Sequence, residues 1–182
     1  AFPSGNGKVV FTYVGYRVSD AIEITQSRMT LEGTIRVTRE NLTGTSTIIS
    51  TSNINPCLHV LGTTAGGNFD GTLEDTQITN MMFSRTAMGI AGSKTVIVEN
   101  VLFCTFLQSG AAFSQYGIYG KNINGLRMNY YHATVGGDLA GNVYGVYIDG
   151  ATQASTGILM NDFVFYGGST PSGTSYAYYD YS

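Results

Sequence analysis

Acidic side chains are the residues of this chain best suited to acid–base chemistry. Hydrolysis of a glycosidic bond usually needs two carboxyl groups about 5 to 9.5 Å apart. Glu74 and Asp75 are adjacent in the sequence and would face opposite ways on a strand. The carboxylates that we weighed are Asp70, Glu74, Asp75, Glu99, Asp138, Asp149 and Asp162, and those kept as catalytic candidates are Asp70, Asp75, Glu99, Asp138 and Asp149.

Tyrosine offers a second kind of chemistry, because its ring packs on the apolar face of a sugar and its hydroxyl forms hydrogen bonds. Tyr119, Tyr147 and Tyr179 hold the same place in a short phrase that returns along the chain. The phrase reads MGIAG at 88–92, YGIYG at 116–120, YGVYI at 144–148 and YAYYD at 176–180, and LHVLG at 58–62 fits it as an earlier copy. Self-similarity at such a regular, intermediate period predicts a solenoid of stacked coils.

The composition predicts that these coils are built from β-strands. Charged residues make up 12% of the chain, about half the usual share, while the 24 glycines and abundant Ser, Thr and Asn favour tight turns. Apolar and polar residues alternate at period two, as in residues 96–99, and no stripe at helical spacing is long enough for a helix. We therefore expect an all-β protein.

Several classes of function are disfavoured by the sequence. A net charge of −3 without a basic patch gives no reason to expect nucleic acid, and no apolar run reaches the roughly 18 residues of a membrane span. Cys57 and Cys104 are isolated, and His59 and His132 lack metal-ligand spacing, so we expect neither a metal nor a cofactor. The start at Ala1 is unlike a natural start or a signal peptide, which suggests a piece of a longer chain.

Asparagine marks a second recurring feature. Residues 78–83 align with 98–103, and residues 126–131 align with 158–163, so that Asn80 matches Asn100 and Asn129 matches Asn161. Asn tolerates the left-handed conformation, and its amide can bond the Asn of the next coil, so an asparagine ladder at a corner is expected. Extending the ladder across both couples would bury Arg127 beside Val98, which needs a partner for its charge.

Residues 8–33 resemble the opening coils of the pectate-lyase superfamily, in the version common in bacteriophage tailspikes and capsule depolymerases. The matching stretches are KVVFTY at 8–13, AIEI at 21–24 and MTLEG at 29–33, with YVGY at 13–16 in place of the usual Pro-containing turn. The resemblance implies a right-handed single-stranded parallel β-helix over a single domain 1–182, with opening coils at 1–51 and regular repeats at 52–182. It also implies a homotrimer in the virion tail, or otherwise extracellular, that binds bacterial polysaccharide.

Stacked coils would sort the recurring residues into inward and outward columns about 4.8 Å apart. A groove of glycines beside a tyrosine column would suit a glycan, although the same tyrosines could instead form a subunit interface or fill the core. The predicted inward residues are Val60, Ile90, Ile118, Val146 and Tyr178, with Met88, Tyr116 and Tyr144 beside them; the outward residues are Ala91, Tyr119, Tyr147 and Tyr179, next to a lane of Gly89, Gly117, Gly145 and Ala177.

The remaining expectations concern the site and its chemistry. Lys121 and Asp149 would share an outward column, where a surface ion pair worth under about 1 kcal/mol is favoured over a pair that polarises a ligand. Asp75 and Glu99 would lie four residues out of register, roughly 13 Å apart, which is too far for joint catalysis. The predicted sugar-binding residues are Tyr119, Tyr147, Tyr179, Lys121 and Asp149. A structural or adhesive shaft without chemistry is the alternative function.

Overall fold

The computed structural model describes most of the chain, and every regular element in the described part is a β-strand. The described residues are 6–12, 15–34, 36–38, 41–43, 46–50, 57–61, 73–84, 88–91, 93–104, 115–134, 141–149, 155–166 and 173–181. Within these ranges there is no helix, which agrees with the all-β prediction.

The strands fall into two classes by length. Those of the N-terminal third are short: β1 (Gly7–Val10), β2 (Gly15–Val18), β3 (Ile22–Ile24), β4 (Met29–Glu32), β5 (Arg36–Thr38), β6 (Asn41–Thr43), β7 (Thr47–Ser50) and β8 (Leu58–Leu61). Long and short strands then follow one another: β9 (Leu73–Ser84), β10 (Met88–Ala91), β11 (Ser93–Cys104), β12 (Gln115–Lys121), β13 (Asn124–Thr134), β14 (Val143–Asp149), β15 (Thr156–Asn161), β16 (Val164–Tyr166) and β17 (Ser175–Tyr181).

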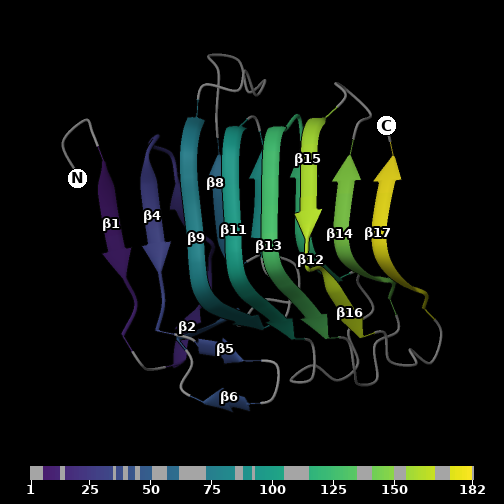
Figure 1. The fold of residues 1–182 in the computed structure, drawn as a ribbon, viewed down its shortest axis with the longest axis horizontal. Helices are drawn as coiled ribbons and strands as arrows, with labels where there is room; N and C mark the ends of the chain where they lie inside the picture. Colours follow the sequence, from purple (N-terminus) through teal and green to yellow (C-terminus); the bar gives the residue numbers. More distant parts are fainter. Residues whose placement is uncertain are drawn as a thin grey trace.

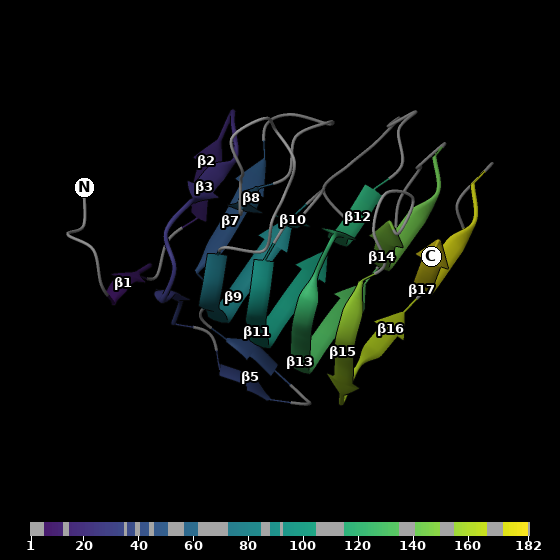
Figure 2. The ribbon, with the colours of Figure 1, turned by 90° about the horizontal axis from the view of Figure 1, so that it is seen from above.

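These strands form two parallel sheets, and from β8 onward the chain visits them in turn. Sheet A runs in the order β1-β4-β9-β11-β13-β15, with β2, β7 and β16 attached; sheet B runs in the order β3-β8-β10-β12-β14-β17. Within each sheet the main strands follow one another along the long axis in chain order (Figure 1), and the view from above separates the two sheets (Figure 2). Strands β5 and β6 form a separate antiparallel pair. We call one passage of the chain through the two sheets a round. Because each strand pairs with the strand of the next round in the same sheet, matching residues form columns.

Two columns of left-handed residues bend the strands of sheet A. One is Arg28, Asp75, Thr95, Gly125 and Gly157, and the other contains Asn80, Tyr130 and Asp162, all with φ between 51° and 92°. Non-glycine residues seldom adopt this conformation. Each long strand therefore turns at fixed points of the round, and side chains on either side of a bend point in different directions.

The asparagine couples are confirmed, but the continuous ladder is wrong. The pairs flanking Asn80 place it opposite Asn100, and the Asn161 amide donates to the Asn129 side-chain oxygen at 3.0 Å. Between the couples the register differs by one residue, since Asn129 pairs with Glu99. This shift puts Arg127 opposite Ile97 on the exposed face, so the buried charge that the ladder would require does not arise.

The core lies between the two sheets and is built from buried columns. Ile118 and Val146 are paired and fully buried, as predicted. Ile90 is not in their column, because Met88 pairs with Ile118 while Ile90 pairs with Gly120. A Cβ at Gly120 would lie 2.5 Å from Ile123 and 2.9 Å from Ile148, so neighbouring isoleucines already fill this space. The predicted alignment of β10 with β12 was therefore two residues out.

Candidate functional site

Tyr116 and Tyr144 do not pack into the core cluster as the sequence predicted, although Tyr144 is buried, with only 8% of its surface exposed. Val143, Val146 and Ile148 belong to the core cluster, whereas the Tyr144 ring contacts the Tyr147 ring at 5.0 Å. Residues three apart face opposite sides of a regular strand, so the alternation must be interrupted between them. Gly145 is the point of interruption: a Cβ there would lie 2.6 Å from the Ala177 carbonyl oxygen and 3.1 Å from two phenylalanine rings.

The outer face of sheet B carries a tyrosine array, by which we mean Tyr116, Tyr119, Tyr144, Tyr147, Tyr176 and Tyr179. Rings at equivalent positions stack along the molecule, with centroids 5.1 to 5.5 Å apart and planes within 10° of parallel. The two stacks meet edge to face, at 68° to 78°. Within a stack the ring faces cover one another, so the array presents mainly ring edges and hydroxyls.

The array is anchored at one side by Asp149. The Tyr119 hydroxyl donates to the Asp149 carboxylate at 2.6 Å, a short hydrogen bond typical of a charged acceptor. Burial and then this carboxylate raise the pKa of Tyr119, and burial likewise raises the pKa of Tyr147. These hydroxyls therefore stay protonated as hydrogen-bond donors. Lys121 lies opposite Asp149 in the register of β12 and β14, so the two residues share a column as expected.

The predicted glycine groove is wrong. Gly117 and Gly145 are buried rather than open to solvent, and Gly145 faces Phe163 and Phe165. Gly89 pairs with Tyr119, not with Gly117. The glycines thus relieve crowding inside the fold, and the surface beside the tyrosines is formed by other tyrosine rings.

His59 lies in line with the array, a relation that no sequence spacing revealed. The outward column of sheet B reads Glu23, His59, Gly89, Tyr119, Tyr147 and Tyr179 through successive registers. Burial lowers the pKa of His59, and the charge of Glu23 partly offsets that effect. A neutral imidazole, able to donate and accept, therefore extends the polar edge of this face.

The structure keeps the predicted carboxylate candidates apart. Asp75 pairs with Thr95, and Glu99 pairs with Thr79, so Asp75 and Glu99 stay four residues out of register as expected. Asp149 belongs to the tyrosine array, on the other sheet. Asp70 and Asp138 lie outside the described residues.

Glu99 instead shares an open depression with Asp162, a pairing that sequence reasoning missed. Arg127, Asn129, Tyr130, Met160 and Asn161 also line this depression. Glu99 lies on β11 and Asp162 follows β15, two strand spacings away and one residue along, so their backbones are about 10 Å apart. Side chains leaning toward each other would reach the separation used by inverting glycosidases. The one-residue register shift at β13 reduces the offset of these two acids along the strands from two residues to one.

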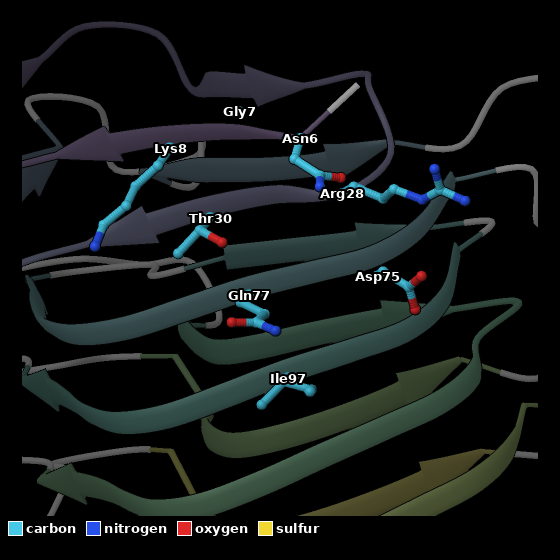
Figure 3. Close-up of a pocket in the computed structure, with 8 residues that line it drawn as sticks. All are labelled: Asn6, Gly7, Lys8, Arg28, Thr30, Asp75, Gln77 and Ile97. Atoms are coloured by element: carbon cyan, nitrogen blue, oxygen red, sulfur yellow. The ribbon is translucent and has the colours of Figure 1, made fainter. Parts of the chain in front are cut away.

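A second depression on sheet A contains Asp75 and is shown in Figure 3. Arg28 and Asp75 lie at one end of it, Thr30 and Gln77 near its middle and Lys8 at the other end. The Lys8 ammonium forms an ion pair with Glu32 at 2.5 Å. Asn6, Thr30 and Gln77 are its polar uncharged side chains, and such side chains suit a ligand rich in hydroxyls.

The described ranges show no sign of a metal site or of a membrane-spanning helix. No group of three or more His, Cys, Asp or Glu side chains gathers there in a way that could hold a metal ion. Nor do those ranges contain a helix of the length and hydrophobicity needed to cross a membrane.

Comparison with known proteins identifies no family for this chain. No family model matches the chain, and no curated protein matches it. Among solved structures, a crystal structure from Parabacteroides merdae, assigned only provisionally as a glycosyl hydrolase, matches 91% of this chain and 81% of its own, with 10% sequence identity and a TM-score of 0.48. A similarity of this size bears on neither the fold nor the activity of this chain.

Proposed function

We propose that this chain is a right-handed parallel β-helix that binds bacterial surface polysaccharide in the manner of a bacteriophage tailspike. The fold part of the proposal is supported by the alternation of the chain between two parallel sheets and by the register of each strand with the next round. A homotrimeric assembly in the virion tail, or elsewhere outside the cell, belongs to the same proposal and rests on the resemblance of residues 8–33 alone.

The tyrosine array is the observation that carries the binding part. Its rings repeat every 5.1 to 5.5 Å, which is close to the length of one pyranose unit in an extended glycan. A polymer lying along the array would therefore meet an equivalent hydroxyl and ring edge at each unit. Tyr hydroxyls both donate and accept, and the raised pKa of Tyr147 keeps its proton in place.

A structural or adhesive shaft is the second candidate, and the same array favours it in one respect. Because the ring faces cover one another, the stacks contribute to the stability of their own rounds, at about 0.5 to 1.5 kcal/mol for each ring pair. A continuous aromatic column on the outside is also what an interface between copies would use. The two candidates differ in whether the hydroxyls or only the rings are needed.

Substitution of Tyr147 separates these candidates. Tyr147→Phe keeps the stacking and removes one hydroxyl, so it should weaken binding to a recognised capsule or O-antigen polysaccharide about fivefold, the value of one hydrogen bond, at unchanged melting temperature. Tyr147→Ala should weaken binding by about 1 to 2 kcal/mol and also lower stability, because its ring is stacked on both faces. Tyr16→Phe, on β2 of sheet A, is the matched control and should leave binding unchanged, although it removes the hydrogen bond that the Tyr16 hydroxyl donates to the Thr12 carbonyl oxygen at 3.3 Å. Unaltered affinity for Tyr147→Phe, with loss of assembly for Tyr147→Ala, would favour the shaft.

Depolymerisation is the further part of the proposal, and Glu99 with Asp162 is the described carboxylate pair that suits it. Incubation with a panel of polysaccharides should release reducing ends, and Glu99→Gln should abolish that release while binding to the tyrosine array persists. Ultraviolet absorbance from unsaturated sugars would indicate elimination in place of hydrolysis. Release of neither product, with binding retained, would contradict the depolymerase part alone.

A further inference from the structure

The tyrosine array holds phenol rings of successive rounds in direct contact with one another. Tyr119 and Tyr147 stack with their centroids 5.5 Å apart and their planes within 6° of parallel. Tyr147 and Tyr179 continue this stack at 5.2 Å and 10°. Because the same rings are also held edge to face by the second stack, their separation is fixed by the fold. Chemistry that joins two phenols therefore finds its reactants already in place.

The stack of Tyr119, Tyr147 and Tyr179 is also within reach of a reagent in solution. All three side chains are half-buried, so part of each is open to solvent. In the other stack Tyr144 is only 8% exposed. An oxidant that takes electrons from surface tyrosines therefore has better access to the first stack than to the middle of the second.

Asp149 supplies a proton acceptor at one ring of this stack. The Tyr119 hydroxyl donates to its carboxylate at 2.6 Å. A phenol that loses one electron becomes a strong acid, so its proton can pass along this hydrogen bond as the electron leaves. Loss of an electron is easier when the proton has a base to go to. Tyr119 is therefore the ring of the stack where oxidation is expected to begin.

We propose that the tyrosine array is a site of oxidative cross-linking, at which a haem peroxidase with hydrogen peroxide joins Tyr119 to Tyr147 as dityrosine. Each ring gives one electron to the peroxidase and one proton to a base, which is Asp149 for Tyr119 and water for Tyr147. The two radicals then form a carbon–carbon bond between positions ortho to their hydroxyls. The hydrogen on each bonded carbon moves to the oxygen and restores the phenol. The two electrons and two protons convert one hydrogen peroxide into two waters.

The link would tie one round of the protein to the next. Tyr119 lies on β12 and Tyr147 on β14, and the two residues are paired in register although they are 28 positions apart in the sequence. Rotation about the Cβ–Cγ bond, a soft torsion, turns the edges of the stacked rings toward each other. A covalent bond across such a loop restricts the unfolded chain, as a disulfide does. Cross-linked protein should therefore melt at a higher temperature than untreated protein.

Treatment of dilute protein with a haem peroxidase and hydrogen peroxide tests the site. The wild type should gain the fluorescence of dityrosine, lose the mass of two hydrogens and still migrate as a single chain on a denaturing gel. Trypsin cuts after Lys94, Lys121 and Arg127, so the proposed link joins the peptide 95–121 to the peptide 128–182. Mass spectrometry of the digest identifies this joined peptide.

Three variants assign the roles. Tyr147→Phe keeps a ring in the stack but removes the phenol, so it should lose most of the joined peptide. Asp149→Asn keeps a hydrogen-bond acceptor but not a base, so it should slow cross-linking at least about tenfold, and added imidazole should restore part of the rate. Tyr16→Phe is the matched control, because the ring that Tyr16 contacts is Phe11, which cannot form dityrosine. It should cross-link as the wild type does.

The outcomes are decisive for the inference and separate from the proposed function. Links only between different molecules, or an equal yield of the joined peptide from Tyr147→Phe, would overturn it. Equal rates for the wild type and Asp149→Asn would overturn the role of Asp149 as the proton acceptor. A melting temperature of untreated Tyr147→Phe near that of the wild type would confirm that its loss of product is chemical. No polysaccharide enters these measurements, so failure of glycan binding would leave the cross-linking site standing.

Discussion

The outer faces of the two sheets cover the same core yet are built in opposite ways. On sheet B one residue type repeats, so that tyrosine rings stack round after round. On sheet A the residue type changes at every step: the column that begins at Lys8 continues as Thr30, Gln77, Ile97, Arg127 and Leu159. The first face is therefore uniform along the molecule, and the second is divided into local depressions.

Strand spacing explains the difference. Neighbouring parallel strands lie about 4.8 Å apart, which suits stacked aromatic rings but brings like charges directly opposite each other, where they repel. Tyrosine can therefore repeat in a column, whereas lysine, arginine or aspartate cannot do so without cost. A repeating face can follow a repeating polymer, and a variable face can recognise one particular unit of it.

The largest effect should come from the core that both faces share. Ile118→Asp places a carboxylate in a fully buried column between Met88 and Val146, with no partner for the charge, and should cost about 4 kcal/mol or more of unfolding free energy. Urea denaturation followed by circular dichroism measures this loss. Leu159→Asp, at a side chain that is 51% exposed, is the control and should change stability little. Wild-type stability of Ile118→Asp would contradict the assigned core.

A smaller effect should appear where sheet B departs from regular alternation. Gly145→Ala puts a methyl group 2.6 Å from the Ala177 carbonyl oxygen, and the resulting strain should cost about 2 to 3 kcal/mol and disturb the tyrosine array. Gly15→Ala, whose added methyl meets nothing within 4 Å, should be neutral or slightly stabilising. Thermal unfolding and near-ultraviolet circular dichroism of both variants would check the comparison. Equal stability of the two would mean that the strand does not need glycine at this point.

Alkaline pH should weaken the protein through its buried tyrosines. Burial raises the pKa of Tyr131 and Tyr119, and burial with the Asp180 hydrogen bond raises the pKa of Tyr178 to about 12. Above the unfolded value of about 10 the unfolded chain loses protons that the folded chain retains, so stability falls as pH rises. Because solvent screens the partly exposed hydroxyls, we expect a loss of only about 1 to 2 kcal/mol from about pH 9 to about pH 11, and Tyr178→Phe should flatten the decline. A free energy of unfolding that does not change from about pH 9 to about pH 11 would contradict the raised pKa values of these tyrosines.

The smallest effect should come from the two histidines, one on each sheet. Burial lowers the pKa of both His59 and His132. As pH falls through the unfolded value of about 6.5, the unfolded chain takes up protons that the folded chain resists, so stability falls, by less than about 1 kcal/mol for each solvent-screened histidine. His59→Gln and His132→Gln should each reduce this acid sensitivity, because each removes one group whose pKa is lowered by burial. Equal acid sensitivity of wild type and both variants would show that neither histidine contributes.

Sequence reasoning succeeded wherever neighbouring repeats are alike. Residues 116–120 and 144–148 align without ambiguity, and the structure pairs Ile118 with Val146 and Tyr119 with Tyr147 as predicted. The prediction failed between 88–92 and 116–120, because matching the Gly-Ile step of each phrase placed Ile90 with Ile118. The space beside Gly120 is filled by Ile123, which follows the strand and forms no part of the phrase. Packing volume in the core, and not sequence similarity between the two phrases, set the register of β10 with β12.

The sequence by itself determined that the protein is all-β, that its strands recur and that Tyr119, Tyr147 and Tyr179 share one outward column, because alternation and repeat spacing are local properties of the chain. Only the tertiary structure decided that a second stack of Tyr116, Tyr144 and Tyr176 packs against them, that Glu99 and Asp162 line one depression and that Arg28 lies beside Asp75. A bend at one glycine or a register shift of one residue moves every later side chain to another face. Such shifts depend on packing between segments that are far apart in the sequence. The residue pattern of one segment therefore does not predict them.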